Sequence, residues 1–195
     1  MIRISSKIIK ILREGGVGVL PTDTLYGLVG SALSPQAVKK IYRLKKRRKD
    51  KPFIILIARL ADLDLFGAQK DITAQLKKFW PGPVSIILPC PSLNKKMFYL
   101  RSLEKTLAFR LPKPYWLRRL LQKTGPLVAP SANWEGEPPS QNILQAKKYF
   151  GSKVDFYVNG GRLTGKPSTL IKIENGKIIV LRQGKSFVHK KAPRC

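Results

Sequence analysis

The chain has 195 residues, of which 43% are hydrophobic, and its 38 Lys and Arg against 11 Asp and Glu give a formal net charge of +27. This length predicts one domain, and the absence of a long apolar run or a secretion signal excludes a membrane span and favours a cytoplasmic location. One histidine and two cysteines without a CxxC pair exclude a zinc site, whereas the positive charge either attracts polyanions such as nucleotides and RNA or serves general solubility.

The chain begins with a predicted helix. Ser5 or Ser6 can cap it, its isoleucines and Leu12 form one apolar stripe, and the glycines at 15–16 end it. The apolar residues that follow predict a buried strand at 17–20.

Later elements alternate short apolar strands with helical patterns. Ser34 and Pro35 predict a second helix, as an N-cap followed by proline at the first helical position. Short strands are predicted at 53–57, 84–88, 106–111, 127–129, 154–158, 169–173 and 178–181. The Asn-Gly pair at 175–176 favours a type I′ turn between the last two strands.

The order of these elements predicts the fold class. Helices alternate with strands early in the chain and a hairpin closes it, which is typical of an α/β domain on a twisted, mixed and largely antiparallel sheet with flanking helices. We expect this domain to span residues 1–185 and a basic tail to span residues 186–195.

Polar groups stand at the ends of several predicted strands. The segment PTDTLYGL at 21–28 directly follows a buried strand, where α/β proteins bind ligands, although such residues also form ordinary turns. Arg110 ends the strand at 106–111, where its guanidinium can clamp a carboxylate or form a surface ion pair. Ser131 and Asn133 follow another strand and offer small donors and acceptors.

A basic run ends the second predicted helix, between Lys39 and Lys51. In a continuing helix Lys45 and Arg47 would point in different directions, whereas an irregular end would put them on one side. A triphosphate needs several such cations because charge develops on its oxygens as pyrophosphate leaves. The ordinary meaning of a charge run is a solvated helix face.

Two further motifs are left out of the candidate site. Trp80, in the turn WPGP, is predicted to pack rather than to stack on a ligand. GGRLTGK at 160–166 has the spacing of a phosphate-binding loop, but Pro167 stands where that loop needs Ser or Thr and no helical pattern follows.

Seven segments in order resemble the YrdC (TsaC) family of threonylcarbamoyl-AMP synthases, over about residues 11–184: PTDTLYGL, KKRRKDKPF, WPGPVSIIL, LAFRLP, APSANWEGEPPS, KPSTLIKI and LRQG. The resemblance implies a mixed sheet around a basic concave face. It also implies synthesis of L-threonylcarbamoyl-AMP and pyrophosphate from L-threonine, bicarbonate or carbon dioxide, and ATP, for a tRNA adenosine modification completed by a downstream threonylcarbamoyl transferase complex. Arg48 stands where the family commonly has proline, and Leu56 where longer members have a threonine-contacting histidine.

The resemblance also implies roles by motif position. L-threonine would be bound by Thr24, Arg110, Ser131 and Ser168, with Arg110 on its carboxylate. ATP would be bound by Arg47, Lys51, Thr106, Asn133, Ser140 and Arg182, with Lys45 and Arg47 acting at the phosphates. Asp23 would be an acid behind the site. Magnesium would arrive bound to ATP, so no metal site in the protein is expected.

Two other functions fit the same residues. The basic concavity could serve as an RNA-binding module that contacts double-stranded RNA or tRNA, for example in ribosome assembly. The chain also resembles the carbamoyl-transfer region of hydrogenase maturation factors, although the domains that accompany that region are missing from this sequence.

Overall fold

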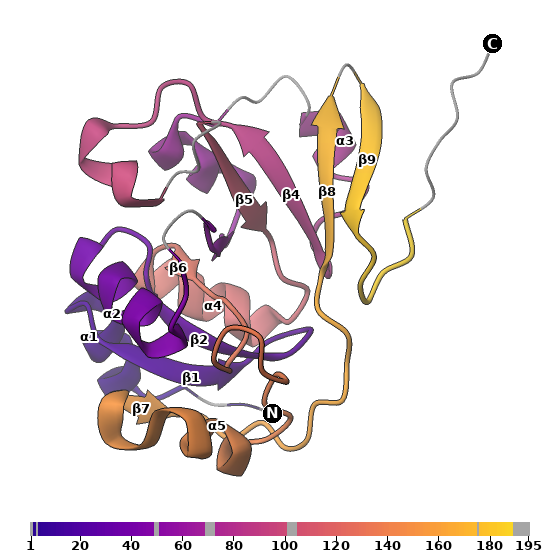
Figure 1. Cartoon of the computed structure of the whole chain (residues 1–195). Helices are drawn as coiled ribbons and strands as arrows, with labels where there is room; N and C mark the ends of the chain where they lie inside the picture. Colours follow the sequence, from indigo (N-terminus) through magenta and orange to yellow (C-terminus); the bar gives the residue numbers. More distant parts are fainter. Residues whose placement is uncertain are drawn as a thin grey trace.

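One mixed sheet with helices on both faces organises the molecule (Figure 1). The computed structural model describes residues 2, 4–48, 51–68, 73–100, 105–174 and 176–188. Across the sheet the strands run β7-β1-β2-β6-β3-β5-β4-β8-β9. Their bounds are β1 Val17–Pro21, β2 Tyr26–Ser31, β3 Ile54–Leu56, β4 Val84–Pro89, β5 Thr106–Arg110, β6 Leu127–Val128, β7 Phe156–Tyr157, β8 Thr169–Glu174 and β9 Lys177–Arg182. Three pairs, β1 with β7, β3 with β5 and β4 with β8, are parallel and the others are antiparallel, which confirms the predicted mixed sheet.

The helices cover the two faces of this sheet. They are α1 Ser6–Arg13, α2 Pro35–Lys45, α3 Thr73–Leu76, α4 Tyr115–Thr124 and α5 Ile143–Phe150, with the 3-10 helices η1 Leu60–Phe66, η2 Lys95–Leu100 and η3 Gly151–Lys153. Helices α2 and α5 bury Ile41 and Phe150 in the larger apolar cluster, whereas α1 and α4 bury Leu12 and Leu121 in a second cluster on the other face. Alternate residues of the central strands belong to one cluster or the other, as the pleat of a strand requires. No helix in the described part of the chain is long and apolar enough to cross a bilayer.

The predicted helix starts are confirmed. The Ser5 side chain accepts a hydrogen bond from the backbone N–H of Ile8 (3.4 Å), and Ser34 accepts one from Ala37 (3.2 Å). Such caps satisfy N–H groups that the first turn leaves without partners.

One strand was not predicted from the sequence. The sequence predicts a ligand-binding segment or an ordinary turn at 21–28, but only the turn at 22–25 is irregular, and β2 begins at Tyr26 and pairs antiparallel with β1. The glycines in YGLVGS weaken the strand signal, and Gly30 is needed because a Cβ there would lie 3.1–3.3 Å from atoms of Ile41, Ala37 and Val17. The small residue therefore lets α2 pack closely on the sheet.

The end of the described chain is a hairpin and a short return. Glu174 pairs with Lys177, and Gly176 has a φ of +72°, in agreement with the predicted turn, although Asn175 lies outside the described residues. Of the expected tail at 186–195, Val188 is buried in the main core, and residues 189–195 lie outside the described part.

Candidate active site

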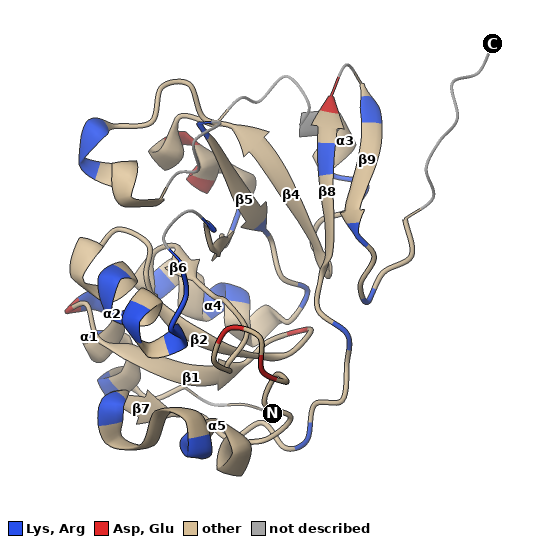
Figure 2. Cartoon of the chain, viewed as in Figure 1, with Lys and Arg blue, Asp and Glu red and all other residues tan. Residues whose placement is uncertain are grey.

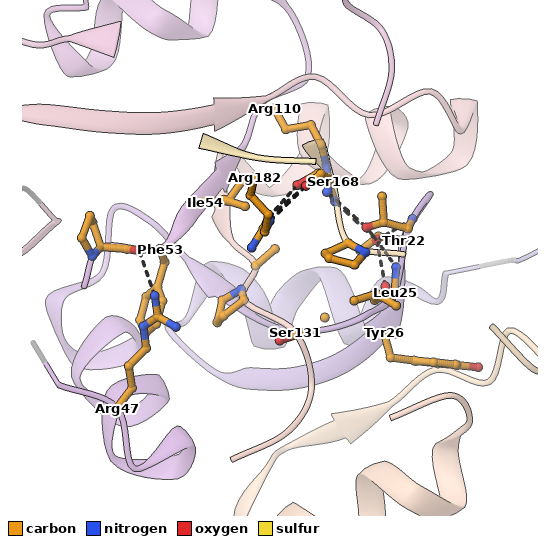
Figure 3. Close-up of a pocket in the computed structure, with 16 residues that line it drawn as sticks. Thr22, Leu25, Tyr26, Arg47, Phe53, Ile54, Arg110, Ser131, Ser168 and Arg182 are labelled. Atoms are coloured by element: carbon orange, nitrogen blue, oxygen red, sulfur yellow. Dashed lines mark hydrogen bonds between the residues drawn. The ribbon is translucent and has the colours of Figure 1, made fainter. Parts of the chain in front are cut away.

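Residues from segments far apart in the sequence line one cavity of about 110 Å³. Figure 3 shows that its side chains come from the β1–β2 turn, the end of α2, the end of β5 and the start of β8. It contains all four residues predicted for L-threonine, Thr24, Arg110, Ser131 and Ser168, and two of those predicted for ATP, Arg47 and Arg182. The predicted groups for the two substrates are therefore adjacent.

The tight turn between β1 and β2 presents two hydroxyl groups to Arg110. Thr22 Oγ1 accepts hydrogen bonds from the backbone N–H groups of Thr24 (3.2 Å) and Leu25 (3.3 Å), which closes the turn. Arg110 donates from Nη1 to Thr24 Oγ1 (3.2 Å) and from Nη2 to Thr22 Oγ1 (3.3 Å). Thr22 is thus a site residue that the sequence did not single out within its motif.

Arg110 forms a buried ion pair rather than a surface one. Its Nη2 lies 3.3 Å from Oδ1 of Asp23, and the two side chains are 4% and 7% exposed. Burial lowers the pKa of Arg110, an effect that the carboxylate of Asp23 opposes and the charge of Arg182 increases. Asp23 therefore balances the charge of the guanidinium from outside the cavity lining, while its Oδ1 and Arg110 Nε are both buried without a hydrogen-bond partner among the described residues.

Ser168 is held on two sides. Arg182 donates to its carbonyl oxygen from Nε (3.3 Å) and Nη2 (3.0 Å), and its hydroxyl lies 2.8 Å from that of Ser85 in β4. Ser85 is fully buried and was also missed from the sequence. Ser85 could have been found as the single hydroxyl in the apolar run at 84–88, because a buried hydroxyl needs a hydrogen-bond partner.

The two cations at the end of α2 separate. The helix stops at Lys45 because Lys46 adopts a left-handed conformation, with φ +53°. Arg47 then lines the cavity, with its Nε bonded to the carbonyl of Lys51 (3.1 Å). Lys45 does not line it: its ammonium donates to the carbonyl oxygens of Ser131 (2.6 Å) and Asn133 (2.8 Å). Buried carbonyls thus hold Lys45 outside the cavity lining, although it remains close enough to Arg47 for that charge to lower its pKa.

The other residues predicted for ATP also lie outside the cavity lining. Lys51 pairs with Glu135 (2.7 Å), and the Ser140 hydroxyl donates to the Ala132 carbonyl (2.5 Å). The side-chain amide of Asn133 donates to two backbone carbonyls of its own loop. Thr106 begins β5 at the end opposite Arg110, about 13 Å away at the usual rise of a strand. Asn133 and Ser140 thus shape the loop at 129–140 in this structure.

The buried position of Lys45 predicts a pH dependence of stability. Burial lowers the pKa of Lys45 from 10.5 to about 7; the charge of Arg47 adds to this shift, and the charge of Glu135 opposes it. Between these values the unfolded chain binds a proton that the native state lacks, so the free energy of unfolding should rise with pH. Urea unfolding at about pH 7 and about pH 9 would measure this: the free energy of unfolding should rise more between the two pH values in the wild type than in Lys45→Met. Parallel gains in both proteins would contradict this assignment.

Gly184 predicts a second effect, on the position of Ser168. A Cβ on Gly184 would overlap the carbonyl oxygen of Pro167 and the backbone of Ser168. We expect Gly184→Ala to displace Ser168 and to weaken binding of L-threonine, the ligand predicted for that residue, about tenfold, because shifts of about 1 Å in positioning groups are costly. Isothermal titration calorimetry with threonine would measure this. Gln183→Ala, at an exposed neighbouring residue, should retain the wild-type affinity.

The cavity carries excess positive charge. Arg47, Arg110 and Arg182 face it, and Asp23 is the one acidic side chain among the described residues within ion-pairing distance of these three. Burial and the charge of Arg47 lower the pKa of Arg182. Within the described residues no group of three or more His, Cys, Asp or Glu could hold a metal ion. The arrangement therefore suits an anionic ligand bound by guanidinium groups.

Comparisons with known proteins show the family of this chain. The Sua5/YciO/YrdC family model, described as "Telomere recombination", matches residues 10–184. A threonylcarbamoyl-AMP synthase of Pyrococcus abyssi is 33% identical over 89% of this chain and 52% of its own length, and a putative one of Methanocaldococcus jannaschii is 32% identical over 95% and 87%. The crystal structure of P. abyssi Sua5 complexed with L-threonine matches with a TM-score of 0.80 and 32% identity, over 93% of this chain and 55% of that one. This chain thus spans about half the length of the P. abyssi relative.

Proposed function

Since this chain belongs to the Sua5/YciO/YrdC family, we propose that it is an L-threonylcarbamoyl-AMP synthase. It would convert L-threonine, bicarbonate or carbon dioxide, and ATP into threonylcarbamoyl-AMP and pyrophosphate, and so act as a nucleotidyltransferase. One observation carries the proposal: a single cavity holds the hydroxyls and guanidinium of an amino-acid pocket directly beside Arg47 and Arg182. The product would pass to a transferase complex that modifies a tRNA adenosine.

The amino-acid pocket is supported by Arg110 and its neighbours. A carboxylate suits the planar fork of a guanidinium, and the buried Nε of Arg110 is a donor that such a ligand can satisfy. The hydroxyls of Thr24 and Ser168 offer hydrogen bonds to the other polar groups of threonine. Asp23 keeps Arg110 in place and would have no direct part in the chemistry.

The reaction requires positioning and charge stabilisation more than proton transfer. The threonine amine forms a C–N bond to carbon dioxide or bicarbonate, with loss of a proton and, from bicarbonate, of hydroxide, to give a carbamate. A carbamate oxygen then bonds to the α-phosphorus of ATP, and the bond from this phosphorus to the bridging oxygen breaks as pyrophosphate leaves. Arg47 and Arg182 would stabilise the phosphate charge, and magnesium bound to the ATP phosphates would add to this. Lys45 and Asn133 would act indirectly, by holding the 129–140 loop against α2.

Pyrophosphate release by the purified chain tests the proposal. With ATP and bicarbonate present, release should require L-threonine, and mass spectrometry should detect threonylcarbamoyl-AMP. Release that is independent of threonine, or its absence under all conditions, would refute the proposal. The alternative of an RNA-binding module in the same cavity is not favoured, because the relatives with this fold are named as synthases.

A further inference from the structure

A second basic region lies on the outer side of α2 and α5, away from the cavity. Two adjoining hollows of about 420 and 600 Å³ share Trp134 and Tyr149 in their walls. The cations around them are Lys40, Arg43, Lys46, Lys148 and Lys153, and no described acidic residue lines either hollow. We call this surface the outer groove. Figure 2 shows that Lys and Arg positions recur along α2 and α5.

The outer groove and the active cavity share no lining residue. The end of α2 separates them, because consecutive residues point to different sides. The ammonium of Lys46 lies 3.7 Å from the centre of the Trp134 ring, whereas Arg47 lines the cavity. The left-handed backbone of Lys46 produces this divergence, and the bonds of Lys45 to the 131–133 segment lie at the junction.

The groove combines the two chemistries that bind a single strand of nucleic acid. Trp134 and Tyr149 are partly exposed and meet edge to face, with ring centres 5.3 Å apart, so they offer aromatic surface to unpaired bases. Lys40 is already paired with Asp155, but Arg43 and Lys153 are exposed and have no acidic partner among the described residues. These cations can contact phosphates on either side of a stacked base.

We propose that the outer groove binds a single-stranded segment of RNA, with bases against Trp134 and Tyr149 and phosphates on Arg43 and Lys153. A duplex keeps its bases stacked inside, so the aromatic rings would contribute to single-strand binding alone. The choice of RNA rests on the proposed function, whose product is destined for an RNA base. Binding there would leave the active cavity free, since the two share no lining residue.

Fluorescence anisotropy with a labelled oligouridine of about 12 nucleotides, and with a duplex RNA of the same length, tests the proposal. The full chain should bind the single strand more tightly than the duplex. Trp134→Leu should weaken single-strand binding about tenfold. The double variant Arg43→Gln/Lys153→Gln should weaken it and reduce the slope of log affinity against log salt by about 1.4, at about 0.7 per phosphate contact.

A matched control removes the same charge from the opposite face of the sheet. Arg118→Gln/Arg119→Gln on α4 should retain a salt slope close to that of the wild type. Three results would overturn the proposal: equal losses of RNA affinity in the two double variants, tighter binding of the duplex than of the single strand, or a loss of RNA affinity only when Arg47 or Arg182 is replaced. Arg43 and Lys153 are exposed, so their variant keeps the test valid if Trp134→Leu misfolds. The Arg43→Gln/Lys153→Gln protein should retain threonine-dependent pyrophosphate release. If the wild type itself released no pyrophosphate, the synthase assignment would fail independently of the RNA-binding result.

Discussion

Arg110→Ala should lower kcat/KM for L-threonine about 10³-fold, which corresponds to about 4 kcal/mol of lost transition-state binding. The guanidinium is the group that we assign to the substrate carboxylate, and Thr22, Thr24 and Asp23 hold it in position. The KM for ATP should change much less, because Arg47 and Arg182 remain. Pyrophosphate release at varied threonine and varied ATP would measure both values.

The control for this variant must separate binding from folding. Removal of Arg110 leaves the carboxylate of Asp23 buried without its partner, which costs about 3–5 kcal/mol of stability in comparable pairs. Arg110→Lys retains a positive charge near Asp23 but loses the fork that binds a carboxylate through two bonds. It should fold, as judged by circular dichroism, and still bind threonine poorly. Normal threonine kinetics in a folded Arg110→Lys protein would show that the amino-acid pocket is wrongly assigned.

Arg47→Ala should have the second large effect, a fall of about 10²-fold to 10³-fold in kcat/KM for ATP. Arg47 lines the cavity and is pre-positioned by hydrogen bonds to the carbonyls of Lys51 and Pro52 and by the Phe53 ring, 5.5 Å away. A fixed cation of this kind stabilises the charge that develops on departing phosphates. The threonine requirement should persist at the reduced rate.

Arg43 provides the matched control for Arg47. It lies in the last turn of α2, four residues before Arg47, and carries the same charge, but it is exposed and outside the cavity. Arg43→Ala should therefore retain ATP kinetics within about twofold, since screened surface charges act weakly. If the two variants lost activity equally, general electrostatic attraction of ATP would explain the result better than a positioned Arg47.

Replacement of Lys51 should affect the use of ATP less than the sequence suggested. Its ammonium is already paired with Glu135, which also accepts a hydrogen bond from the backbone N–H of Arg48. A contact of Lys51 with ATP would require this ion pair to open. In the structure Lys51 instead joins the segment after α2 to the 129–140 loop, through Glu135.

Local signals in the sequence were sufficient for most elements of the fold. The caps at Ser5 and Ser34, the apolar runs and the Asn-Gly turn each depend on neighbours within a few residues, and the structure agrees with them. The exception was β2, whose glycines carry no strand signal of their own. One of them, Gly30, is required by the close approach of α2, a contact between residues distant in sequence.

The chemistry of the site was also visible in the sequence, but its geometry was not. Arg47, Arg110 and Arg182 could be named from motif order, because residue type and strand ends are local properties. Only the tertiary structure separated Arg47 from Lys45, buried Ser85 against Ser168 and placed Asp23 behind Arg110. Each of these outcomes depends on which carbonyl, hydroxyl or carboxylate another segment brings within hydrogen-bonding distance, and no spacing along the chain encodes that.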